Sequence, residues 1–97
     1  MTSKQRAYLK GLASNMDPIV HVGKASASAE VVTSVQEALE ARELIKIGVL
    51  KNCADDPHTI AEIISERTHS QIVHVIGKKI VLYKPNKDKP RIKLPID

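Results

Sequence analysis

The segment of this 97-residue chain best suited to chemistry is Gly23-Lys24-Ala25-Ser26, between a short β-branched run and a helical pattern. The first backbone N–H groups of a helix lack intrahelical partners and carry a partial positive charge, which favours an anion. Gly23 lets a phosphate oxygen approach closely, Lys24 adds a mobile positive charge, and Ser26 adds a hydroxyl donor. The segment predicts a phosphate-binding loop; the alternative is that Gly23 only turns the chain and Ser26 only caps the helix.

Nucleotide hydrolysis does not fit this loop. A P-loop has a further glycine five residues before the glycine of its Gly-Lys pair, and Pro18 stands at that position here. Ala25 follows the lysine, so the hydroxyl that would hold Mg²⁺ is also missing. We therefore do not expect an NTPase.

The other reactive side chains form no catalytic or metal-binding set. Cys53 has no second thiol nearby, and no two histidines show the i, i+4 spacing of a helical zinc site. Asp55 and Asp56 precede Pro57, as in a helix cap, rather than forming an acid/base couple. We expect no enzyme, no catalytic residue, no metal site, no cofactor and no small-molecule substrate. The histidines are His21, His58, His69 and His74.

The positive charge of the chain is concentrated at its two ends. The net charge is +4 overall, but +3 in residues 1–24, −4 in 25–70 and +5 in 71–97. A basic surface usually meets phosphate or anionic lipid. No apolar run approaches the ~18 residues of a membrane span, and no signal peptide is visible. With a single cysteine, we expect a reduced cytoplasmic protein without a membrane partner.

Five further basic residues accompany the loop. Lys4, Arg6 and Lys10 share the first helical pattern, and Lys78 and Lys79 follow a glycine between two strand patterns. All five are candidates for contact with phosphate groups; the alternative is a solvated, solubilising surface. Only two aromatic residues are present, so base stacking on protein rings is disfavoured.

The elements that position these residues follow from hydrophobic spacing. Apolar residues recur every three or four positions in three segments, as on a helical face, and β-branched residues dominate four others. Gly77 at the first central position favours a type II′ hairpin turn. A right-handed strand–helix–strand crossover makes an α/β fold, α-β-α-β-α-β-β with a four-stranded mixed sheet covered by three helices, the simplest solution. The expected elements are helices 3–16, 27–42 and 57–68 and strands 19–22, 44–50, 71–76 and 79–84.

The expected domain covers residues 1–84, and residues 85–97, with three prolines and alternating charges, predict an extended or disordered tail. Within the domain, four segments resemble one known family: residues 3–10 its opening helix, 22–26 its loop, 37–46 its helix-to-strand junction, and 75–77 with 80–83 its hairpin. The junction, EALEARELIK, is the most specific of them. The family is the CRM domain in its stand-alone bacterial YhbY-like form, and the resemblance covers roughly residues 2–84.

The resemblance implies a fold similar to the C-terminal domain of translation initiation factor three. It also implies that residues 23–26 act like the Gly-x-x-Gly backbone clamp of KH domains, with Ser26 in place of the last glycine. It places the first helix beside this loop, so we expect Lys4, Arg6 and Lys10 to extend a positive track from Lys24 on one side of the molecule.

The function that the resemblance implies is RNA binding in assembly of the large (50S) ribosomal subunit. We expect a non-catalytic, cytoplasmic monomer whose partners are ribosomal RNA and pre-50S particles. The alternative is a protein-interaction module that docks on a ribosomal protein or assembly factor through the acidic middle of the chain, including Glu37 and Glu40.

Overall fold

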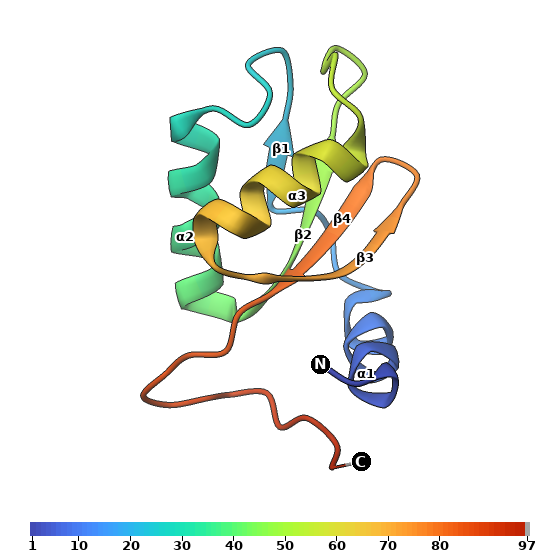
Figure 1. Cartoon of the computed structure of the whole chain (residues 1–97), viewed down its shortest axis with the longest axis vertical. Helices are drawn as coiled ribbons and strands as arrows, with labels where there is room; N and C mark the ends of the chain where they lie inside the picture. The colour runs from blue at the N-terminus through green and yellow to red at the C-terminus, as the bar shows by residue number, and fades with distance from the viewer. Residues whose placement is uncertain (97) are drawn as a thin grey trace.

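The computed structural model describes residues 1–96, and its elements follow the order α-β-α-β-α-β-β (Figure 1). They are α1 (Ser3–Ala13), β1 (Val20–Val22), α2 (Ala29–Arg42), β2 (Leu44–Val49), α3 (Pro57–Thr68), β3 (Gln71–Ile76) and β4 (Lys79–Tyr83). The strands form one mixed sheet in the order β1-β2-β4-β3, in which only β1 and β2 are parallel. The predicted α/β class, with three helices and a four-stranded mixed sheet, is confirmed.

Each helix begins at a residue whose side chain accepts a backbone hydrogen bond: Thr2 for α1, Ser28 for α2 and Asp56 for α3. The Ser28 hydroxyl oxygen accepts from the backbone N–H of Val31 at 3.3 Å, which satisfies one of the N–H groups left open at a helix start. Ser26 is therefore not the cap of α2, and α2 begins two residues later than the sequence pattern predicted.

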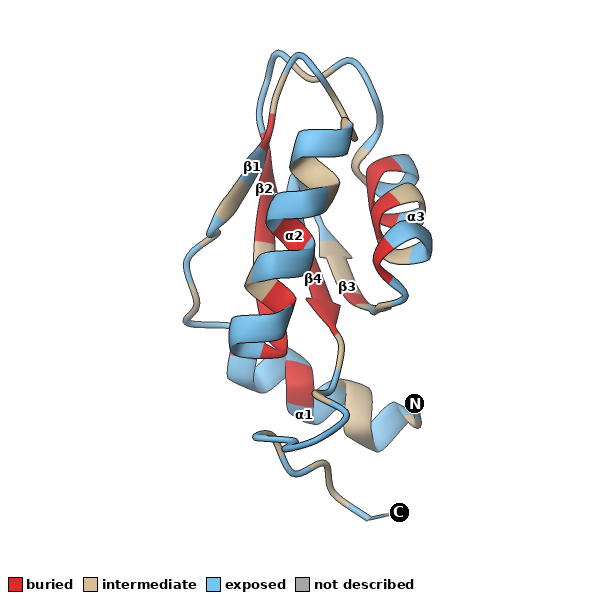
Figure 2. Cartoon of the chain, turned by 90° about the vertical axis from the view of Figure 1, so that its left-hand side faces the viewer, coloured by how far each residue is buried: buried red, intermediate tan, exposed pale blue. Residues whose placement is uncertain are grey.

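The sheet has a hydrophobic core on each face. Side chains alternate between the two faces along β4. Ile80 and Leu82 therefore lie on the face covered by α2 and α3, and Val81 and Tyr83 lie on the face where α1 packs. Figure 2 shows the buried side of α3 turned toward the sheet. The second core, which we name the α1 core, consists of Leu9, Ala13, Leu44, Val73, Val81 and Tyr83. This core occupies only one end of its face of the sheet, because α1 covers only that part of the strands.

Two local features shape the β3–β4 hairpin. The register of β3 against β4 shifts between Ile72 and His74, which indicates a β-bulge at this edge strand. Gly77 has φ +55° in the turn, while the following Lys78 is not in the positive-φ region, in agreement with the predicted type II′ turn.

Residues 84–96 form no helix or strand, but Glu43 fixes this segment to the domain. Glu43 is fully buried, and its carboxylate accepts from the backbone N–H groups of Asn86 at 2.6 Å, Arg91 at 2.8 Å and Ile92 at 2.9 Å. Burial opposes ionisation, but these three donors and the Arg91 charge together lower the pKa of Glu43. Ile92 and Leu94 also pack against the α1 core. The division into a domain of residues 1–84 and a tail stays a prediction.

Candidate nucleic-acid interface

The loop at residues 23–26 is a tight turn that projects from the end of β1. The backbone N–H of Ser26 donates to the carbonyl of Gly23 at 2.9 Å. A Cβ at Gly23 would lie 3.2 Å from Oδ1 of Asn52, so glycine allows the neighbouring loop to approach closely. Lys24 and Ala25 are exposed at the tip, and their backbone N–H groups are bonded to no other described residue. The turn thus presents two free N–H donors and one ammonium group to solvent.

Ser26 occupies the position of the last glycine of the Gly-x-x-Gly pattern, with φ +58°. This left-handed conformation costs an L residue roughly 1–2 kcal/mol, which gives a physical reason for glycine at this position. The Ser26 hydroxyl donates to a carboxylate oxygen of Asp55, from the loop that precedes α3. That hydroxyl, which the sequence suggested as a phosphate donor, is therefore bonded within the protein.

Three lysines extend from the same edge of the sheet as the loop. Lys24 follows β1 by two residues and Lys51 follows β2 by two residues, and the last residues of these strands, Val22 and Val49, are register partners. Lys78 lies in the β3–β4 turn, and its carbonyl accepts from the N–H of Val49 at 2.8 Å. We name Lys24, Lys51 and Lys78 the lysine edge. Their ammonium groups form no hydrogen bond or ion pair within residues 1–96, and all three side chains are exposed.

The sequence reasoning identified Lys24 and Lys78 but missed Lys51. Lys51 follows a strand pattern without a glycine or a helical repeat, so nothing local distinguishes it. Only the parallel register of β1 and β2 brings it beside Lys24. The predicted strand–helix–strand crossover made these two strands parallel but did not make them neighbours in the sheet. A prediction of that adjacency would have been the signal.

The first helix does not lie beside the loop. Both views place α1 toward one end of the long axis and the β1–α2 loop at the other (Figures 1 and 2). The expectation of one positive track from Lys24 along α1 is therefore wrong. The cause is that β1 leads the chain away from α1, and the loop follows at the far end of this strand.

The basic residues of α1 have three different environments. Arg6 is half-buried, and its Nη1 donates to the carbonyls of Ile72 at 2.5 Å and Val73 at 3.0 Å, where β3 bulges. Arg6 therefore binds α1 to the sheet. Lys4 extends toward the carbonyl of Ile96 at 3.5 Å. Lys10 is exposed and lines a groove on the sheet, while Lys79, also exposed, lies on the sheet surface next to the lysine edge.

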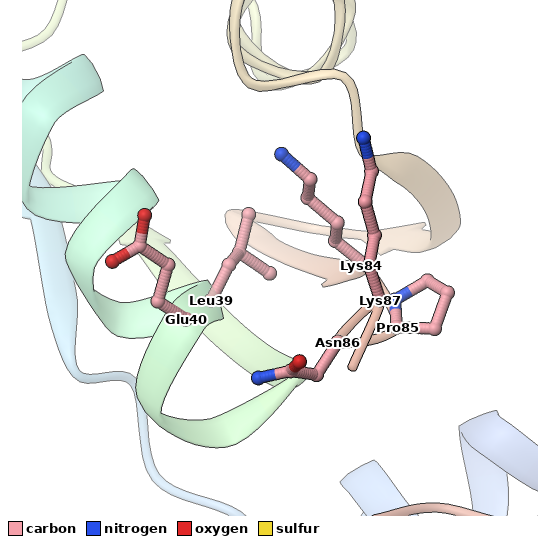
Figure 3. Close-up of a pocket in the computed structure, with 6 residues that line it drawn as sticks. All are labelled: Leu39, Glu40, Lys84, Pro85, Asn86 and Lys87. Carbon is pink, nitrogen blue, oxygen red and sulfur yellow. The ribbon is translucent and has the colours of Figure 1, made fainter. Parts of the chain in front are cut away.

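Acidic side chains lie both beside the candidate loop and far from it: Asp55 accepts a hydrogen bond from Ser26 of the loop. Glu37 and Glu40 are exposed on α2. A pocket of about 190 Å³ lies where α2 meets the start of the tail, and Figure 3 shows Glu40 on one side of it and Lys84 and Lys87 on the other. Lys84 donates to the carbonyl of Thr68 at 2.9 Å, so this lysine also links parts of the fold.

The described part of the chain contains neither a group of metal-binding side chains nor a membrane-spanning helix. Within residues 1–96, no three His, Cys, Asp or Glu side chains are grouped closely enough to hold a metal ion. The helices in this range are all too short or too polar to cross a bilayer.

Known proteins resemble this chain over nearly its whole length. Residues 1–84 match the CRS1/YhbY (CRM) domain. The chain is 43% identical over 95 residues to Probable RNA-binding protein YqeI of Bacillus subtilis, covering 98% of this chain and 99% of that protein. It is 33% identical over 95 residues to an RNA-binding protein of Haemophilus influenzae, covering 98% and 95%.

A solved structure agrees with the same assignment. The solution structure of the hypothetical protein SAV1595 of Staphylococcus aureus matches with a TM-score of 0.82 at 44% identity, over 98% of this chain and 99% of that chain. The resemblance of four sequence segments to one family is thereby confirmed. The chain belongs to the CRS1/YhbY (CRM) domain family.

Proposed function

We propose that this protein binds RNA without catalysing a reaction and acts in assembly of the large ribosomal subunit. The observation that carries the proposal is the lysine edge beside a loop with two unpaired N–H donors at its tip. The names of the Bacillus subtilis and Haemophilus influenzae relatives support RNA as the partner. The resemblance to stand-alone bacterial CRM proteins supports precursors of the 50S subunit as the source of that RNA.

In this proposal, one RNA phosphate binds at the tip of the loop. The N–H groups of Lys24 and Ala25 donate to its oxygens, as backbone amides do in other phosphate-binding turns. Lys51 and Lys78 then neutralise neighbouring phosphates of the same strand or of an adjacent one. Such contacts position the RNA backbone and carry little sequence information. Specificity therefore comes from RNA shape, in a cytoplasmic protein that works as a monomer and needs no cofactor.

Crosslinking in cells tests both parts of this proposal. The full chain is crosslinked to RNA by ultraviolet light, and the attached RNA is sequenced. We expect reads concentrated on precursors of large-subunit ribosomal RNA, and few reads from a Lys24→Glu/Lys51→Glu variant expressed at the same level. Reads spread over unrelated transcripts would overturn the role in 50S assembly. An equal yield from the double variant would overturn the lysine edge as the binding site.

A further inference from the structure

Part of the sheet face on which α1 packs is left uncovered. The Leu44–Tyr83 pair lies under α1 and is buried. Farther along the strands toward the lysine edge, two rows of paired residues follow on the same face. The first row is Lys46, Val81 and His74, and the second is Gly48, Lys79 and Ile76. Neither row contains an acidic residue.

The first row forms the wall of a groove of about 300 Å³ between the sheet and α1. Lys10 reaches this groove from α1 and Lys46 from β2, and neither ammonium group has a hydrogen-bond or ion-pair partner within residues 1–96. Ile76 supplies the exposed apolar surface between them, while Ala13 and Val81 are buried at the base of the groove. Ile76 is 60% exposed, which is high for an isoleucine in a strand. The groove thus combines two unpaired cations with an apolar floor.

The groove is continuous with the lysine edge. Lys79, in the second row, directly follows Lys78 of that edge. Lys79 is two positions from Val81, the register partner of Lys46, and such diagonal neighbours on adjacent strands lie about 7–8 Å apart. On the β1 side, the side chains of His21 and Pro18 cover Gly48 and form the boundary of this surface. A Cβ at Gly48 would lie 3.2 Å from Cδ2 of His21 and 3.4 Å from Cβ of Pro18. The lysines therefore form a path from the edge into the groove.

We infer that a single strand of RNA continues from the lysine edge over Lys79 into the groove between Lys46, Lys10 and Ile76. This inference rests on the proposed function and adds a second contact surface to it. Phosphates bind the two lysines, and a base packs on the exposed side chain of Ile76 in place of an aromatic ring. An RNA strand suits this surface better than an acidic peptide, because the surface continues a basic edge that already presents free N–H donors.

His74 contributes a neutral polar group to the groove. Burial, and to a smaller extent the charge of Lys10, lower the pKa of His74, so the imidazole is neutral at pH 7. A neutral imidazole has one donor and one acceptor nitrogen. It can therefore bond a base edge or a ribose 2′-hydroxyl without adding charge.

Nuclear magnetic resonance on the full chain tests the inference with a ten-nucleotide oligouridylate as the probe. We expect amide shifts at Lys24 and Lys78 and also at Lys46, His74 and Ile76. Shifts at the lysine edge alone would overturn the groove contact and leave RNA binding intact. No shift anywhere, with no binding to ribosomal RNA either, would overturn the proposed function itself.

A matched pair of variants measures the energetic contribution of the groove. Lys46→Gln removes a groove charge, and Lys87→Gln removes an exposed tail charge as the control. We expect Lys46→Gln to weaken oligouridylate binding by about threefold to tenfold and to make the salt slope shallower by about 0.7. The control should change affinity less than twofold, and both variants should keep the wild-type amide spectrum. Equal affinities of the two variants would overturn the inference.

A photoreactive p-benzoylphenylalanine at position 76 identifies the occupant of the groove in cells. We expect it to crosslink to RNA. Crosslinks to protein alone would assign the groove to a protein partner and overturn the RNA contact.

Discussion

The hydroxyl of Ser26 donates a hydrogen bond to a carboxylate oxygen of Asp55, and this bond joins the β1–α2 loop to the loop before α3. An acid is thus held beside the turn that presents the N–H groups of Lys24 and Ala25. The bond keeps Ser26 in its left-handed conformation, but the carboxylate repels an incoming phosphate. The loop is therefore shaped by a group that opposes its proposed ligand.

Asp55→Asn should increase RNA affinity. The amide oxygen can still accept from Ser26, while the negative charge is lost. A unit charge at about 4 Å is worth about 1 kcal/mol in water, so we expect affinity to rise about threefold to fivefold at low salt. Fluorescence anisotropy with ribosomal RNA measures this, with Asp88→Asn on the tail as the control. Unchanged or weaker binding would show that Asp55 does not face the RNA.

Ser26→Gly and Ser26→Val test the backbone requirement of the loop. Glycine adopts φ +58° without strain, so relief of strain should offset the lost hydrogen bond to Asp55. We expect Ser26→Gly to retain wild-type stability within about 0.5 kcal/mol. Ser26→Val should lose about 1–2 kcal/mol, because a β-branched residue adopts positive φ less readily than serine and the hydrogen bond to Asp55 is also lost. Urea denaturation followed by circular dichroism distinguishes the two. Equal stabilities of the two variants would contradict the strained position.

Glu43→Gln should destabilise the fold, and the effect should depend on pH. The carboxylate accepts three backbone bonds from the tail, and charged hydrogen bonds in a buried site are worth about 1.5–3 kcal/mol each. Because glutamine weakens these three hydrogen bonds, we expect the free energy of unfolding to fall by about 2–4 kcal/mol at pH 7.

The sign of the pH effect follows from the lowered pKa of Glu43 in the folded state. Its stabilisation is complete well above the ordinary glutamate value of 4.5 and is lost as the pH falls below that value through the lowered folded pKa. Urea unfolding of wild type and Glu43→Gln at a series of pH values should therefore show a difference that shrinks in acid. A constant difference would contradict this role of Glu43.

Arg6→Ala should affect stability rather than RNA binding. The guanidinium donates to two carbonyls at the bulge of β3, and the substitution removes both hydrogen bonds from a partly buried site. We expect a loss of about 1–3 kcal/mol in unfolding free energy and less than a twofold change in RNA affinity for the folded protein. A large loss of affinity at unchanged stability would return Arg6 to the RNA interface.

The sequence predicted those parts of the fold that local chemistry determines. The start of α3 was correct because Asp56 and Pro57 mark a helix beginning in any context. The first helix was predicted too long because Met16 continues its apolar spacing, whereas Met16 packs against the α1 core from the turn that follows. The start of α2 was predicted too early for a similar reason. Ala27 contacts the core, but it does so from outside the helix.

The candidate site was predictable only where its residues are neighbours in the sequence. Gly23 and Lys24 stand in one loop, so their pattern was visible. The contribution of Lys51 depends on strand pairing, and the bond from Ser26 to Asp55 joins loops 29 positions apart. The role of Glu43 depends on a tail whose composition gave no sign of attachment. These relationships arise from tertiary structure, which spacing along the chain does not encode.

The salt dependence of RNA affinity tests the central claim most directly. With roughly 3–5 phosphates neutralised, the logarithm of affinity for a large-subunit ribosomal RNA fragment should fall with the logarithm of salt concentration at a slope of about −2 to −4.5. Lys24→Glu/Lys51→Glu/Lys78→Glu should bring the slope about 2 closer to zero and abolish most binding. The control variant Lys87→Glu/Lys89→Glu/Lys93→Glu makes the same change in net charge on exposed tail residues. It should retain most of the RNA affinity and most of the wild-type salt slope. Equal losses in the two variants, or a wild-type slope near zero, would contradict the account.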